Sequence, residues 1–67
     1  MKNRLCLSKE IYRIDNIKKA VDDYQKLASI VISEDENYFY CVFEKTIYDV
    51  DLTINEFENY VIGLMFK

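Results

Sequence analysis

Residues 37–45 read NYFYCVFEK, and every position from Tyr38 to Phe43 is apolar or aromatic. A strand that covers a single core alternates apolar with polar residues, because successive side chains point to opposite faces. This run therefore predicts a strand that is apolar on both faces. We expect one alternating set to face the core: Phe39, Cys41 and Phe43.

Two shorter segments also have the pattern of strands. Residues 4–8, RLCLS, alternate and place both leucines on one side. Residues 29–33, SIVIS, are short and rich in β-branched residues. The polar tract 33–37 that follows them predicts a hairpin with the run at 38–43.

A helix is expected between the strands at 4–8 and 29–33. Asp15 is a favourable N-cap, and the apolar residues after it recur at a helical spacing that forms one stripe. The stripe consists of Ile17, Ala20, Val21, Tyr24, Leu27 and Ala28. A strand, a helix and a second strand in this order form a βαβ unit, which makes the two strands parallel.

The C-terminal third predicts a short extended segment and a second helix. Residues 46–52 alternate apolar with polar residues and predict a fourth, edge strand, although an extended connector fits as well because no tight-turn residues precede them. Residues 53–56, TINE, form a capping box, in which the Thr53 hydroxyl and the Glu56 carboxylate each satisfy a free backbone N–H. We therefore expect the helix to begin at Thr53. Its inner stripe is Ile54, Phe57, Val61, Leu64 and Met65.

Together these segments predict one small α+β domain over residues 1–67, in the order β-α-β-β-(β)-α. The simplest packing is a two-layer sandwich, in which both helices cover one face of a three- or four-stranded sheet. A chain of 67 residues buries only about 60% of its unfolded surface on folding, so its stability is expected to be thin.

Catalysis and metal binding are not expected from the residue types present. The chain has no histidine, which removes the commonest general base and the commonest transition-metal ligand. Its single glycine excludes a glycine-rich phosphate loop. Cys6 and Cys41 lie on different predicted strands, and two thiolates without further Cys or His do not complete a tetrahedral zinc site. We expect no catalytic residue, metal or cofactor, and we expect both cysteines to be small apolar residues in or near the sheet.

The charge is distributed unevenly, with a formal +3 on residues 1–26 and −6 on residues 27–67. The aromatic residues cluster in the acidic half, so nucleic-acid binding is not expected. Two cysteines do not make a disulfide framework, and the N-terminus lacks the apolar stretch of a signal peptide. No apolar run approaches the roughly 20 residues that span a bilayer. We expect a cytoplasmic protein without a membrane segment.

The sheet face away from the helices has nothing in this chain to cover it. Tyrosine suits such a half-hydrated surface, because its ring buries area while its hydroxyl stays in water. A contiguous apolar patch on a small domain often marks an interaction site. We predict a partner-binding face that consists of Tyr38, Tyr40, Val42, Val31 and Cys6, with Ile47 as a further candidate.

Two motifs resemble the HxsD-like family of the His-Xaa-Ser peptide-maturation systems: residues 12–20, YRIDNIKKA, and residues 57–62, FENYVI. The matching positions are Tyr12, Ile17, Ala20, Phe57 and Asn59. Members of that family are small accessory proteins encoded beside radical SAM enzymes that modify ribosomally made peptides. The resemblance implies a non-catalytic helper whose partner is a radical SAM enzyme or its precursor peptide, and it assigns no role to Tyr12 or Asn59.

The sequence is compatible with three functions. The first is a non-enzymatic binding or accessory module that holds a peptide or a partner enzyme, as the family resemblance also implies. The second is a structural homodimer in which a second copy covers the open sheet face. The third is a phage or mobile-element inhibitor that binds a host protein through the acidic segment 34–58.

Overall fold

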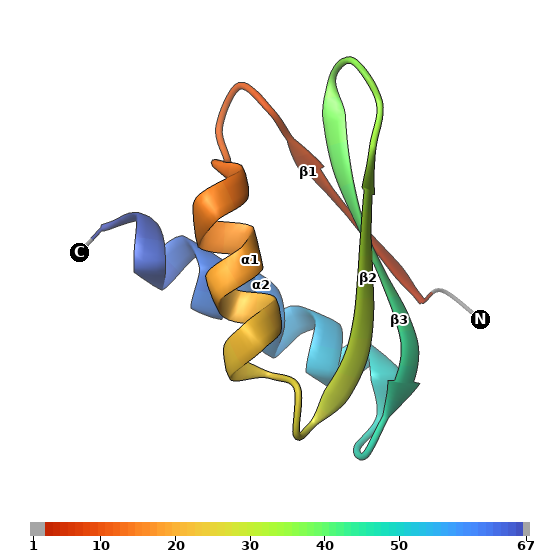
Figure 1. Cartoon of the computed structure of the whole chain (residues 1–67). Helices are drawn as coiled ribbons and strands as arrows, with labels where there is room; N and C mark the ends of the chain where they lie inside the picture. Colours follow the sequence, from red (N-terminus) through yellow and green to blue (C-terminus); the bar gives the residue numbers. More distant parts are fainter. Residues whose placement is uncertain (1–2, 67) are drawn as a thin grey trace.

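The computed structural model describes residues 3–66 and contains a three-stranded antiparallel sheet with two helices. The elements in chain order are β1 (Arg4–Ser8), α1 (Ile14–Asp23), β2 (Ala28–Glu34), β3 (Tyr38–Thr46) and α2 (Val50–Met65). Both helices lie on the same side of the sheet (Figure 1). The predicted α+β class is therefore confirmed, with three strands in the sheet.

The apolar run forms the middle strand of the sheet. The strand order is β1-β3-β2, and β3 pairs antiparallel with both neighbours. The two outer strands are therefore parallel to each other, as predicted for a βαβ unit, but β3 separates them. At the centre of the sheet, Cys41 lies opposite Leu5 on one side and Ile32 on the other.

The core lies between the sheet and the helices. Phe39, Cys41 and Phe43 are buried, as their alternation predicts, with exposed fractions of 7%, 0% and 2%. The ring of Phe57, on α2, packs edge to face against Phe43 and Tyr24, with 5.3 Å between ring centroids in both pairs. This aromatic cluster joins the middle strand to both helical segments.

The first helix starts earlier and ends earlier than predicted. It begins at Ile14, so Asp15 lies in its first turn, and the N-cap position is Arg13, whose side chain makes no capping bond. It ends at Asp23, and the Leu27 and Ala28 amides then both bond the Tyr24 carbonyl in a tight turn, at 2.8 and 2.9 Å. The apolar spacing continued past the end of the helix because Ala28 is the buried first residue of β2.

The predicted fourth strand at 46–52 is wrong, and so is the predicted helix start at Thr53. Instead α2 begins at Val50, with Asp49 as N-cap: its carboxylate accepts a bond of 3.0 Å from the Leu52 amide. Thr53 lies inside the helix and is buried, and its hydroxyl donates to the Asp49 carbonyl at 2.8 Å. The earlier start places Thr53 and Ile54 on the buried side while Leu52 stays exposed. Neither helix within residues 3–66 is long and apolar enough to cross a membrane.

Truncation of the central aromatic residue tests this account of the core. Phe57→Ala leaves a large cavity and is expected to lower the free energy of unfolding by about 3–5 kcal/mol, a large part of the total for a small domain. Urea denaturation followed by circular dichroism measures the change. The control is Phe66→Ala, because Phe66 is 82% exposed and its loss is expected to matter by no more than about 0.5 kcal/mol. Equal unfolding midpoints for the two variants would contradict the assigned core.

Candidate functional site

All five residues predicted to bind a partner lie on the sheet face opposite the helices. Two exposed neighbours, one on β1 and one on β2, share this face with them. We call this surface the uncovered face; it consists of Arg4, Cys6, Val31, Ser33, Tyr38, Tyr40 and Val42. Ile47, the further candidate, lies after β3 and is 63% exposed, so it is not part of this sheet surface.

The register of the strands arranges the uncovered face in rows across the sheet. Val42 lies between Arg4 on β1 and Val31 on β2. In the next row Tyr40 lies between Cys6 and Ser33. Val42 and Tyr40 are half-buried by these neighbours, whereas Val31 on the edge strand is 47% exposed. The face therefore has two adjacent valines, Val42 and Val31, in one row and Tyr40 in the next.

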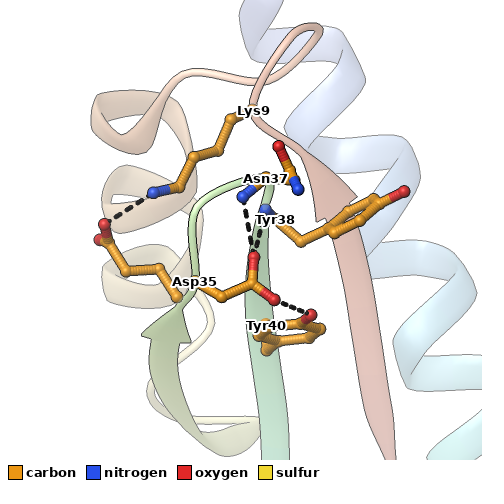
Figure 2. Close-up of polar contacts among 6 residues, drawn as sticks. Lys9, Asp35, Asn37, Tyr38 and Tyr40 are labelled. Atoms are coloured by element: carbon orange, nitrogen blue, oxygen red, sulfur yellow. Dashed lines mark hydrogen bonds and ion pairs between the residues drawn. The ribbon is translucent and has the colours of Figure 1, made fainter.

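The hairpin between β2 and β3 fixes one end of this face. The Asp35 carboxylate accepts backbone N–H bonds from Asn37 and Tyr38, at 2.9 and 2.8 Å, and its second oxygen accepts the Tyr40 hydroxyl at 2.6 Å (Figure 2). The hydrogen bond from Tyr40, followed by the two backbone bonds, lowers the pKa of Asp35, and the same side-chain bond raises the pKa of Tyr40. Close by, Lys9 bonds Glu34 at 2.8 Å and joins the end of β1 to the hairpin.

The Tyr40 side chain has contacts at its ring as well as at its hydroxyl. The guanidinium carbon of Arg4 lies 4.8 Å from its ring centroid, which is within the range of a cation–π contact. The Tyr38 ring lies beside it, with 6.3 Å between centroids and a 40° tilt. Tyr40 is thus fixed in place, while Tyr38, 42% exposed, is the more accessible of the two aromatic rings.

Sequence reasoning missed Arg4 and Asp35, although a signal for Asp35 was present. An Asp that begins a hairpin turn commonly accepts bonds from backbone amides two and three residues later, as an Asx turn does. The part that Arg4 plays depends on the pairing of β1 with β3, which no local pattern in the sequence indicates.

The two cysteines lie on opposite faces of the sheet. Cys6 is exposed, whereas Cys41 is fully buried, and burial raises the pKa of the Cys41 thiol to about 11. They therefore form no redox or metal-binding pair. Within residues 3–66, no three Cys, His, Asp or Glu side chains come together as a candidate metal site.

The structure shows the surroundings of Tyr12 and Asn59, the two positions to which the family resemblance assigns no role. Tyr12 is half-buried and packs against the core, where burial, followed by the charge of Glu58, raises its pKa. Asn59 is exposed on α2. Neither belongs to the uncovered face.

Comparisons with protein-family models, with curated proteins and with solved structures gave no match. The similarity to the HxsD-like family therefore stays a prediction from short motifs.

Removal of the Tyr40 hydroxyl tests the electrostatics of the hairpin. Tyr40→Phe is expected to raise the pKa of Asp35 toward its ordinary value, because the largest cause of its depression is lost. A carboxylate with a depressed folded pKa stabilises the fold above its unfolded pKa, and this stabilisation is lost as pH falls through the folded pKa. The variant should therefore lose less stability on acidification than the parent. NMR titration of the Asp35 carboxyl carbon checks the shift.

The control for this titration is Tyr38→Phe, because Tyr38 bonds Asp35 through its backbone amide and not through its ring. It should leave the pKa of Asp35 where it is in the parent. An unchanged pKa in Tyr40→Phe would show that the hydroxyl bond has no part in the shift.

Thiol labelling tests the two cysteine environments. Iodoacetamide at pH 8 is expected to modify Cys6 in the folded protein and to leave Cys41 unmodified, because only the exposed thiol is accessible and the buried one stays protonated. Mass spectrometry should show a single adduct, and a second adduct after denaturation in urea. Two adducts at the same rate in the folded protein would contradict the assigned faces.

Proposed function

We propose that this protein is a non-enzymatic binding module that holds a protein or peptide partner on the uncovered face. The observation that carries the proposal is the composition of that face, where Val31 and Val42 form an apolar row beside two tyrosine rings. Both helices pack on the other side of the sheet, so no described element covers this row (Figure 1). A contiguous apolar patch on the surface of a small domain often marks an interaction site.

Preorganisation of the face supports the proposal. Tyr40 is held by Asp35 at its hydroxyl and by Arg4 over its ring, so a partner that packs on it does not have to immobilise a free side chain. Fixing a flexible side chain on binding costs about 0.5–1.5 kcal/mol, and here the fold itself already fixes it. Tyr38 and Val31 then supply accessible area on either side.

The polar chemistry of the face favours binding over catalysis. The shifts at Asp35 and Tyr40 keep the carboxyl ionised and the phenol protonated at neutral pH. A general acid or base works best with a pKa near the operating pH, and both groups are shifted away from it. Arg4, which is exposed, provides N–H donors for a carboxylate or carbonyl of the partner.

The more specific role is an accessory to a radical SAM enzyme that modifies a ribosomally made peptide, with that enzyme or its precursor peptide as the partner. This part of the proposal is supported by the motifs at 12–20 and 57–62 alone. A radical SAM gene and a short precursor gene beside this one would support it, and their absence would restrict the proposal to partner binding.

The test uses a peptide ligand titrated into the isotopically labelled protein. The ligand is the neighbouring precursor peptide where one is encoded, or otherwise a peptide selected on the immobilised protein from a random display library. Amide shift changes are expected at Tyr38, Tyr40 and Val42. Tyr38→Glu is expected to weaken binding at least about tenfold, because it places a charge where the partner's apolar side chains pack. Tyr40→Glu is a poorer probe, since it also sets two carboxylates side by side at Asp35.

The matched control is Asn55→Glu, which makes the same charge change at an exposed position of α2. It should bind as the parent does, and equal binding by Tyr38→Glu would overturn the proposal. Shift changes at the acidic residues of segment 34–58 that leave Tyr40 and Val42 unshifted, with affinity that falls steeply as salt is added, would favour the inhibitor function instead.

A further inference from the structure

The outer edge of β2 carries backbone groups directed away from the sheet. The Phe43 amide donates to the Asn3 carbonyl at 2.8 Å, on the β1 side, so its partner on β2, Ile30, does not receive that bond. At the other end of the ladder, the Asp35 amide donates to the Tyr38 carbonyl at 3.0 Å. Pairs in an antiparallel ladder alternate between bonded and non-bonded.

This alternation fixes the direction of the backbone groups of β2 from Ile30 onward, on the hairpin side of the register shift between Ser29 and Ile30. Counting from Asp35, the bonded pairs with β3 fall at Ser33 and Val31. The N–H and C=O groups of Ile30 and Ile32 therefore point outward, along the free edge of the sheet. Both ends of the ladder lead to the same assignment.

The edge of β2 lacks the features that usually protect a sheet edge. Its centre, Ile30 to Ile32, is β-branched and uncharged, and it contains no proline. Ile30 and Ile32 are only half-buried although they point to the helical side, and Val31 is 47% exposed. The other edge strand, β1, is shorter and starts at a charged residue, and the turn after it uses the carbonyl of Ser8 to accept two amide bonds.

The sequence of this edge is the same in both directions, because residues 29–33 read SIVIS. If two copies pair antiparallel about a two-fold axis at Val31, Ile30 of each copy lies opposite Ile32 of the other. These are the residues whose backbone groups point outward, so they form bonded pairs. A slip of one residue would set outward groups against inward ones and lose those bonds.

The charges at the two ends of β2 suit the same pairing. Glu34 ends the strand, and Ala28 begins it beside a shallow hollow whose lining includes Lys26 and Lys45. The two-fold pairing places Glu34 of one copy opposite Ala28 of the other, next to this basic hollow. Lys9 of the same copy pairs with Glu34, but Asp35 and Glu36 follow it and keep this end acidic. Each acidic end therefore meets a basic end, whereas a parallel pairing would place like ends together.

We propose that two copies of this chain associate through β2 and form one continuous six-stranded sheet, with Val31 against Val31 at the two-fold axis. This inference goes beyond the proposed function, because it uses the edge of the sheet and leaves Tyr38 and Tyr40 on the uncovered face free for a partner. Backbone bonds at the edge and the matched β-branched side chains would hold the dimer.

The test is the mass in solution, by size exclusion with light scattering, of the parent and of two matched variants. The parent is expected to have twice the monomer mass. Val31→Glu should be a monomer, because it sets two carboxylates opposite each other at the axis. Ser33→Glu makes the same change on the same strand and face, away from the axis and toward the basic end of the second copy, and should remain a dimer. A monomeric parent, or a dimeric Val31→Glu, would overturn the proposal.

Two further measurements separate this contact from a loss of folding. An equal mixture of Val31→Glu and Val31→Lys should recover the dimer mass, because the opposite charges then meet at the axis; no recovery would overturn the pairing of Val31 with Val31. Ile32→Pro removes an outward N–H and should yield a folded monomer, whereas Val31→Pro removes a bond to β3 and should unfold, as judged by circular dichroism. A dimeric Ile32→Pro would also overturn the proposal. Tyr38→Glu does not touch the edge, so the proposed function can fail while the dimer stands.

Discussion

Phe43 and Phe57 meet edge to face with their ring centroids 5.3 Å apart, and this contact decides which side of the sheet the helices cover. Phe43 shares its face of β3 with Phe39 and Cys41, so all three are buried together. Since strand side chains alternate, Tyr38, Tyr40 and Val42 are then necessarily on the other side. Both helices pack on the first side, so none of the elements described within residues 3–66 lies on the second. The uncovered face is thus a consequence of this packing together with the apolar run at 38–43.

The alternation along β3 could be interpreted from sequence because its period is tied directly to the two faces of a sheet. Both alternating sets of this strand are apolar, so the choice of face depends on polarity: Tyr38 and Tyr40 carry hydroxyls that suit a hydrated surface, whereas Phe39, Cys41 and Phe43 do not. The start of α2 could not be predicted from the sequence pattern. Asp49 and Thr53 are both good N-caps four residues apart, and the short alternation at 46–52 fits a strand as well as a helix. The burial of Thr53 and Ile54 decides between them, and burial depends on the rest of the fold.

The candidate site shows the same division between local and non-local information. The five predicted residues could be assigned to one face from alternation within each strand. The contact of Arg4 with the Tyr40 ring could not be assigned in this way, because it requires β1 to pair with β3 rather than with β2. A βαβ unit makes β1 and β2 parallel whether or not a third strand is inserted between them. Strand order is a property of the whole sheet, and no single segment carries it.

The order β1-β3-β2 also separates the two surfaces on which the proposals rest. Because β3 is in the middle, its tyrosines lie away from both edges, and the most apolar edge belongs to β2. Val31 is the residue that these surfaces share, since its side chain lies on the uncovered face and its strand forms the edge. In a dimer about Val31, the rows Arg4–Val42–Val31 of the two copies would join end to end. An extended partner that crosses the axis could then contact both copies at once, and the second contact would raise its affinity through effective concentration without any new type of contact. Association would also stabilise each copy, because mass action favours the folded state that forms the dimer.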